Sequence, residues 1–202
     1  MEFLVDMTTH VPPRTSPAAV DDMRAREALR AHELAVTGHL LRLWRPPFTP
    51  GQWRTLGLFS AATADQLETE LASMPLRVWR TDAVIPLAAH SNDPGNRTSA
   101  SPSTEFLVTM TITVPQGVTS AVIEDREAGE AVRAGELAAR GILRRLWKLP
   151  AETGEQRTLG LWAAPDEPVL TSTFRSLPLY DWMVVATTPL SAHPSDPLSA
   201  AA

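Results

Sequence analysis

The apolar and polar positions of the chain follow two periods, and each change of period marks an expected element. Residues 2–11, EFLVDMTTHV, alternate as a strand does. Residues 16–38 have helical spacing, open with Ser-Pro and close at Gly38, as capped helices do. Two short strands, a shorter helix and a last strand are expected at 39–45, 53–59, 63–74 and 78–87. The order β-α-β-β-α-β predicts helices packed on one face of a mostly antiparallel sheet.

The same pattern returns further along the chain. EFLVDMT at residue 2 reappears as EFLVTMT at residue 105, and this offset of 103 holds without a gap from residue 2 to residue 94, with about 43 of the 93 pairs identical. Two long copies indicate a tandem duplication rather than a solenoid. We expect domains at 1–94 and 105–197, joined by a flexible Gly/Ser/Thr/Pro linker at 95–104. The predicted fold class is α+β, with two ferredoxin-like βαββαβ domains forming a pseudo-dimer of the dimeric α+β barrel type.

Composition and charge exclude several classes of protein and of site. The 202 residues carry a net charge of −5 and no cysteine, which excludes disulfides and thiolate chemistry. No apolar run approaches the ~18 residues of a membrane span, and the start has no secretory-signal pattern. No basic stripe favours nucleic acid, and the five histidines lack metal-ligand spacing. We expect a cytoplasmic protein that binds neither nucleic acid, membrane nor metal.

A glutamate interrupts the apolar face of the predicted helix in both copies. On a helical wheel, Glu27 is centred in the stripe formed by Val20, Met23, Ala31 and Leu34. Glu130 has the equivalent place in the second copy. Burial of a carboxylate is costly and raises its pKa. A solvated glutamate on a tilted helix or an ion pair with Arg30 would explain the position structurally, whereas a general base tuned toward neutral pH would explain it functionally.

Arginines and aromatic residues supply the other candidate groups. Arg42 is expected to share a strand face with Leu40 and Trp44, where it suits a substrate carboxylate, a partly buried ion pair or a snorkelling role at a sheet edge. His90 and His193 lie in tails after the last strands, where capping is the favoured interpretation. The predicted substrate-binding residues are Arg30, Arg42, Trp44, Trp53 and Thr55 in the first copy and Arg133, Arg145, Trp147, Gln156 and Thr158 in the second.

Several of these segments together resemble a known family. EFLVDMT, the helix that carries Glu27 and ends at Gly38, LRLWR, and LPLYDWM at 177 with its His-Pro tail are similar to muconolactone δ-isomerase. The resemblance covers nearly the whole of that small protein in each copy. It implies a ferredoxin-like fold, dimers that assemble into decamers, and a cofactor-free isomerisation in which a base moves a proton on a butenolide ring. The base of the family matches Glu27 and Glu130.

The chain also departs from the family pattern. Trp53 and Thr55, with Gln156 and Thr158 in the second copy, stand where the family has a tyrosine and an asparagine. The predicted function is a cofactor-independent isomerase or cyclase acting on a lactone or related carbonyl compound, in a homo-oligomer of pseudo-dimers. A cofactor-free oxygenase, a lactone dehalogenase and a non-catalytic binding or assembly module remain alternatives.

The two predicted pockets are expected to differ. The first keeps an aromatic wall at Trp53, where the second has Gln156. Glu27 has Met23 one turn before it, where Glu130 has Arg126, and a cation there would lower the pKa of Glu130. The first copy is therefore the favoured catalytic one.

Overall fold

The computed structural model describes residues 1–48, 52–95 and 104–198. Apart from its two end residues, the expected linker lies outside the described residues, as do residues 49–51.

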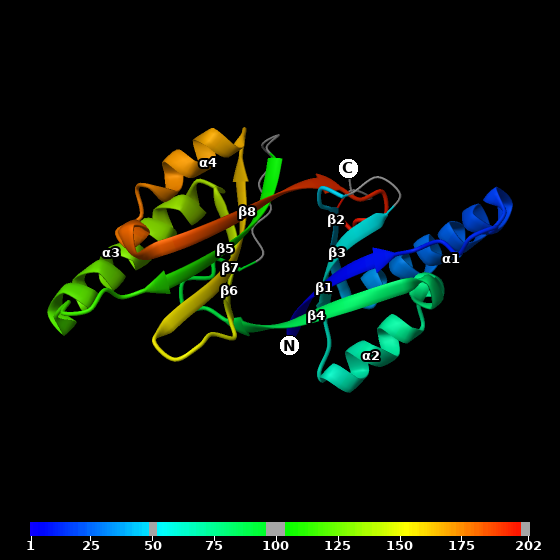
Figure 1. Ribbon diagram of the computed structural model, residues 1–202, viewed down its shortest axis with the longest axis horizontal. Coiled ribbons are helices and arrows are strands. Elements are labelled where there is room, and N and C mark those ends of the chain that lie inside the picture. Colours follow the sequence, from blue (N-terminus) through cyan, green and yellow to red (C-terminus); the bar gives the residue numbers. More distant parts are fainter. Residues whose placement is uncertain (49–51, 96–103, 199–202) are drawn as a thin grey trace. The chain divides into compact units, whose positions relative to one another are not determined.

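The predicted order of elements is confirmed in both repeats (Figure 1). The first repeat contains β1 (Glu2–Thr9), α1 (Pro17–Val36), β2 (Leu40–Arg45), β3 (Trp53–Ser60), α2 (Ala64–Ala72), the 3-10 helix η1 (Pro75–Trp79) and β4 (Arg80–Ala89). The second contains β5 (Thr104–Thr113), α3 (Ser120–Ala139), β6 (Leu143–Leu149), β7 (Glu155–Ala164), α4 (Glu167–Phe174), the 3-10 helix η2 (Tyr180–Trp182) and β8 (Met183–Ala192). The α+β fold class is confirmed.

The ends of α1 follow the sequence signals. Ser16 is the N-cap, and its hydroxyl accepts a hydrogen bond from the Ala19 backbone N–H at 3.2 Å, with Pro17 in the first turn. Gly38 has a φ of +76°, the left-handed conformation that lets the chain leave the helix without a steric penalty.

The last strand of the first repeat begins later than predicted. The expected start at Val78 is wrong, because residues 75–79 form η1 and β4 begins at Arg80. Pro75 opens this turn with a fixed, helix-compatible φ, and the Arg77 N–H donates to the Met74 carbonyl at 3.0 Å. The short helix places the Leu76 backbone N–H within hydrogen-bond distance of the Glu27 side chain of α1.

The chain folds into two compact units that are not identical with the repeats. One unit comprises residues 1–87 and the segment from Ser191 onward, and the other comprises residues 88–190. In the first unit Trp44 and Arg45 of β2 pair with Ala192 and Ser191 of β8. In the second unit Trp147 and Lys148 of β6 pair with Ala89 and Ala88 of β4. Each unit therefore contains the tail of the other repeat.

Within each unit the helices cover one face of the sheet and enclose the core (Figure 1). The first strand of each repeat is central: β1 pairs with β3 and β4, and β5 pairs with β7 and β8, all antiparallel. The core of the first unit joins this sheet face to the helices through Phe3, Val5, Leu34, Leu43, Phe59 and Leu71. The equivalent core of the second unit contains Phe106, Val108, Leu137, Leu146, Trp162 and Phe174.

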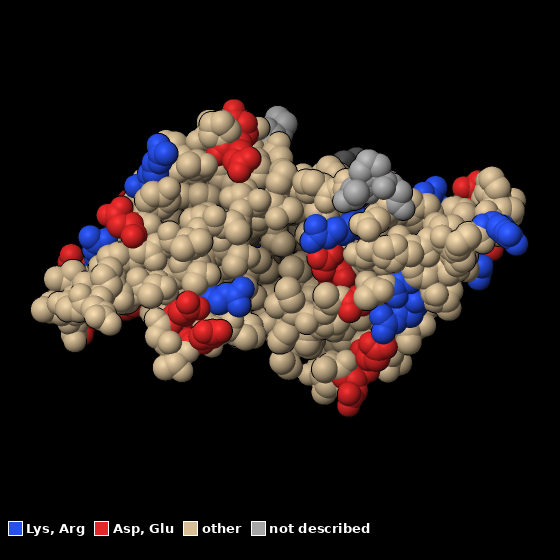
Figure 2. Space-filling model, viewed as in Figure 1, with Lys and Arg blue, Asp and Glu red and all other residues tan. Residues whose placement is uncertain are grey.

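Charges on the surface are mixed. On the face shown in Figure 2, acidic and basic side chains of the described residues lie interspersed. Of the helices in the described part of the chain, none is both long and apolar enough to cross a membrane.

Candidate functional site

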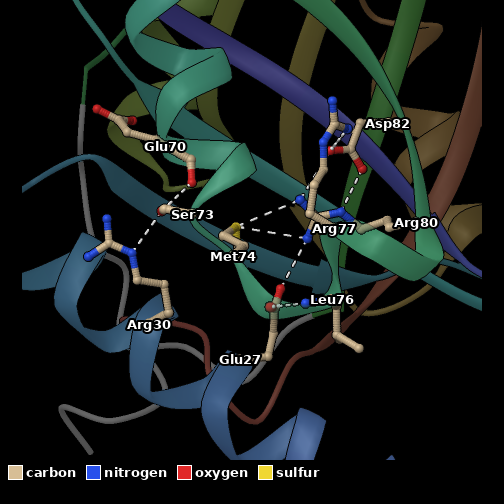
Figure 3. A network of polar contacts seen from close by, with 9 residues as sticks. All are labelled: Glu27, Arg30, Glu70, Ser73, Met74, Leu76, Arg77, Arg80 and Asp82. Atoms are coloured by element: carbon tan, nitrogen blue, oxygen red, sulfur yellow. Dashed lines mark hydrogen bonds and ion pairs between the residues drawn. The ribbon is translucent and has the colours of Figure 1, made fainter.

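Glu27 projects from the middle of α1 toward η1, and only 14% of its side chain is exposed. Its Oε2 accepts a hydrogen bond from the Leu76 backbone N–H at 2.8 Å, and its Oε1 lies 3.0 Å from Nη1 of Arg80 (Figure 3). Burial raises the pKa of Glu27, and nearby Asp82 raises it further, whereas the Leu76 hydrogen bond and the Arg80 cation act in the opposite direction. The expected shielding and raised pKa are both found.

A buried charge network lies behind Glu27, and sequence reasoning did not find it. Arg80 and Asp82 have side chains only 2% exposed, and Arg80 Nε lies 2.6 Å from Asp82 Oδ1. Arg77 continues the network to Asp82 at 2.6 Å and to Glu68 at 2.8 Å. Charged residues at these positions are typical of a solvated strand, so the sequence carried no signal that Arg80 and Asp82 are buried.

Glu130 has the equivalent place in the second repeat but different neighbours. Its Oε2 accepts a hydrogen bond from the Leu179 backbone N–H at 3.1 Å. The two buried members of the network are replaced at the equivalent positions by Met183 and Val185. Burial raises the pKa of Glu130, and the Leu179 hydrogen bond lowers it. Among the described residues no cation lies within ion-pair distance of this carboxylate.

The expected effect of Arg126 on Glu130 is therefore corrected. Nη1 of Arg126 donates to the Pro178 carbonyl at 2.9 Å, and its guanidinium lies 4.5 Å from the ring centroid of Trp182. The Arg126 guanidinium is thus bound by Pro178 and Trp182, and the pKa of Glu130 is set by burial and by the Leu179 hydrogen bond. The arginine that contacts a candidate base lies in the first repeat instead, and it is Arg80. Contrary to expectation, Arg126 therefore does not make Glu130 the weaker base.

Each glutamate lies on the wall of its own cavity. The first cavity, of about 580 Å³, lies within the first unit, and the second, of about 550 Å³, lies within the second unit. Of the predicted site residues, the first is lined by Glu27, Trp53 and Thr55, and the second by Glu130, Gln156 and Thr158. Three predicted residues of each repeat are thus brought together.

Arg30 and Arg133 do not line these cavities. Arg30 donates from Nε to the Ser73 hydroxyl at 2.9 Å and pairs through Nη1 with Glu33 at 2.8 Å, so it faces away from Glu27 (Figure 3). Arg133 makes the equivalent contacts to Ser176 and Glu136, at 3.0 and 2.6 Å. These arginines connect the long helix of each repeat to the end of the short helix.

Arg42 and Trp44 also lie away from the cavity, and the expectation that they share a face with Leu40 is wrong. A register shift separates Leu40, which pairs with Phe59, from Arg42, which pairs with Leu58. Phe59 belongs to the core beneath the helices, so its neighbour Leu58 faces the other side of the sheet, and Arg42 and Trp44 face that side too. The same shift in β6 turns Arg145 and Trp147 away from the second cavity.

Carboxylates from the tails bind these two arginines. Arg42 Nη2 lies 3.2 Å from Asp196 Oδ2, and Arg145 Nε lies 3.2 Å from Asp93 Oδ1. The same aspartates accept backbone N–H bonds from β2 and β6 at 3.0 and 2.8 Å. Each guanidinium also lies 4.6 Å from the ring centroid of the tryptophan two residues on, Trp44 or Trp147. The contacts fix each tail to its unit.

The tails bring one histidine to each cavity. His193 lines the first cavity and His90 the second. Their Nδ1 atoms accept backbone N–H bonds from Ser195 and Asn92 at 3.1 and 3.0 Å, which places the proton of the neutral ring on Nε2. Burial and the Arg45 cation lower the pKa of His193 to about 4, and burial also lowers that of His90. The predicted capping is found, but the tail positions gave no sign of the cavities.

No metal centre is found in the part of the chain that the structure describes, because no three or more of its His, Asp and Glu side chains are grouped to hold an ion.

Comparisons with known proteins place these sites in a family. The family described as muconolactone delta-isomerase matches residues 1–93 and again residues 104–196. A muconolactone delta-isomerase of Cupriavidus pinatubonensis is 32% identical over 90 residues, which is 45% of this chain and 95% of that protein. A muconolactone delta-isomerase of Rhodococcus opacus is 29% identical over 91 residues, which is again 45% of this chain and 95% of that protein.

Solved structures support the fold over the whole chain. A heme-binding protein from Thermus thermophilus has a TM-score of 0.60 at 11% identity, covering 98% of this chain and 93% of that one. Chlorite dismutase from Candidatus Nitrospira defluvii has a TM-score of 0.60 at 8% identity, covering 94% and 91%. At these identities the likeness concerns the fold alone. The family match covers both repeats, so the chain belongs to the muconolactone delta-isomerase family and carries the family's domain twice.

Proposed function

We propose that the protein is a cofactor-independent isomerase that moves a proton on a lactone or a related carbonyl compound, with Glu27 and Glu130 as bases. One observation carries the proposal: in each repeat a largely buried carboxylate with a raised pKa lies on the wall of a cavity large enough for such a substrate. A general base works best when its pKa lies near the operating pH, and burial moves a carboxyl in that direction.

The residues around each glutamate suit a proton shift. The carboxylate removes a proton from the carbon next to the carbonyl, and the electron pair passes into the ring as a dienolate. The negative charge gathers on the carbonyl oxygen, where a neutral donor stabilises it. In the first cavity the Nε2–H of His193 and the hydroxyl of Thr55 are available for this role, and in the second those of His90 and Thr158. The protonated glutamate returns its proton at another carbon, which completes the double-bond shift.

The backbone N–H bonds limit how the glutamates move. Leu76 and Leu179 each donate to Oε2 of their glutamate, at 2.8 and 3.1 Å. One oxygen is thereby held, and the side chain keeps its direction toward the cavity while the proton is taken and returned. Pre-organisation of this kind reduces the loss of freedom in the reacting state.

A non-catalytic module is less well supported. A protein that had lost its reaction is expected to fill the cavities with side chains, whereas both remain open at about 580 and 550 Å³. A lactone dehalogenase or a cofactor-free oxygenase would use the same base, and the products of the reaction distinguish them.

The test is proton exchange. A panel of butenolides, including muconolactone, is incubated with the protein in deuterated water and followed by NMR. The proposal expects a shifted double bond with deuterium at the carbon that receives the proton, because the glutamate exchanges its proton with the solvent, and loss of both in the variant with Glu27→Gln and Glu130→Gln. Undiminished exchange in that double variant would rule out the glutamates as bases.

Assembly of the protein into homo-oligomers is part of this proposal. Leu29 on α1 and its equivalent Val132 on α3 are 67% and 66% exposed. Large apolar side chains at the same exposed position of both repeats favour a contact surface between copies of the chain.

A further inference from the structure

The residues lining the two cavities differ in charge at equivalent positions. Arg24 of α1 lines the first cavity, and the position 103 residues later in the second cavity is Glu127. Gln52 in the first is likewise replaced by Glu155 in the second. The first lining contains three arginines and one glutamate, whereas the second contains one lysine, one arginine and three glutamates. The formal balance is therefore positive in one cavity and negative in the other.

Ion pairs alter these balances without reversing them. In the first cavity Arg54 is neutralised by Asp6 at 2.6 Å, and the two carboxylates Glu27 and Asp82 are offset together by the two cations Arg80 and Arg77. Arg24, whose guanidinium lies 3.9 Å from the ring centroid of Trp53, then remains with Arg45 as the source of positive potential.

In the second cavity the negative charges are held close to the site. Glu127 accepts a hydrogen bond from Gln156 Nε2 at 3.2 Å, and both residues belong to the lining. Glu130 has no cation within ion-pair distance among the described residues, as shown above. Arg157 donates to the Pro150 carbonyl at 3.3 Å, so it does not neutralise either glutamate. With three glutamates against Lys148 and Arg157, the lining keeps a negative excess that disfavours an anion.

The second cavity also has a buried indole in its wall. Nε1 of Trp162 is buried and has no hydrogen-bond partner among the described residues, and Trp162 lines this cavity. The equivalent position in the first repeat is Phe59, which has no donor. The indole nitrogen lies against Gly160, and the rest of the Trp162 ring forms part of the wall that an entering ligand would contact.

We propose that the two cavities take different members of one ligand class, the first a lactone that carries a carboxylate and the second an uncharged lactone. The inference rests on the proposed function only for the lactone core of the ligand. The charge of the remainder follows from Arg24 and Arg45 in one cavity and from Glu127 and Glu155 in the other, because a cleft lined by one sign of charge concentrates ligands of the opposite sign.

Two non-reacting probes test the selectivity. The saturated lactone 5-oxotetrahydrofuran-2-acetic acid carries a carboxylate, and its methyl ester does not; neither has a double bond to shift. Each cavity contains one tryptophan, Trp53 or Trp162, so 5-fluorotryptophan labelling and fluorine NMR report on them separately, with Trp53→Phe and Trp162→Phe for assignment. The acid is expected to shift the Trp53 signal at concentrations at least about tenfold below those that shift Trp162, and the ester to show the reverse order of preference.

Variants in which the charge of one lining residue is reversed test the source of the selectivity. Arg24→Glu is expected to weaken binding of the acid at Trp53 about tenfold at low salt, and much less at high salt, where screening shortens the range of the charge. Glu127→Arg is expected to strengthen its binding at Trp162. Arg26→Glu changes the net charge equally on the same helix but lies outside the cavity, paired with Asp22 at 2.8 Å, and is expected to change binding less than twofold.

Equal preference of both probes for both tryptophans, or no shift by either probe, would overturn the inference. So would an Arg24→Glu effect that does not depend on salt, or one that Arg26→Glu reproduces. Because the probes bind without reacting, a failure of proton exchange on butenolides would refute the proposed isomerase and leave this binding result standing.

Discussion

Removal of the buried arginine beside Glu27 is expected to destabilise the protein far more than removal of the whole charge pair. Arg80 and Asp82 are each 2% exposed and 2.6 Å apart. Arg80→Met leaves two carboxylates of the buried network, Glu27 and Asp82, with Arg77 as the remaining cation, and leaving a buried charge uncompensated in this way costs about 3–5 kcal/mol. For a chain of this size that corresponds to a decrease in Tm of roughly 6–20 °C.

The double variant Arg80→Met with Asp82→Val is expected to recover most of that loss. It recreates the second repeat, where Met183 and Val185 occupy the same positions, so the fold already accommodates an apolar pair there. Replacement of a buried ion pair by apolar residues is often neutral or stabilising. Arg77 then keeps its contact with Glu68 at 2.8 Å.

Urea unfolding followed by circular dichroism measures the free energy of unfolding of the original protein, the two single variants and the double variant. A coupling free energy of at least about 2 kcal/mol between the two substitutions is expected. Arg26→Met, which breaks a surface pair four residues apart on α1, is the control and should cost only about 0.5 kcal/mol. Additive losses in the double variant would show that the Arg80–Asp82 pair is not the coupled, desolvated unit described above.

Three further outcomes are expected. Burial raises the pKa of Glu130, so its protonated form contributes stability to the folded state below the usual carboxyl pKa, and this contribution is lost as pH rises through the raised pKa. Glu130→Gln should therefore raise Tm more at about pH 8 than at about pH 4. A change in Tm that is the same at both pH values would contradict the assignment. In a Glu130→Gln background, which isolates the first cavity, His193→Ala should reduce proton exchange by about 100-fold, as loss of an oxyanion donor does, and a loss below about threefold would exclude that role. Leu29→Arg with Val132→Arg should lower the mass measured by light scattering, and an unchanged mass would place the oligomer contact elsewhere.

The sequence by itself determined the features that depend on local or periodic information. The offset of 103 residues revealed two copies, and the alternation of strand and helix periods predicted the order of elements. The caps at Ser16 and Gly38 marked the ends of α1 because capping acts within a few residues. The wheel position of Glu27 predicted its partial burial, since a helix of twenty residues can turn only one stripe toward a sheet.

Only the tertiary structure decided which groups surround each glutamate. A single register shift in β2 turned Arg42 away from the cavity, and a two-residue period cannot reveal such a shift. Arg80 and Asp82 became buried together because η1 and β4 fold back against α1, which no local pattern records. His193 shares a cavity with Glu27, 166 residues away in the sequence, because each unit contains the tail of the other repeat. Charge at a site is the sum over residues that are distant in sequence, so the opposite signs of the two cavities become visible only when the chain is folded.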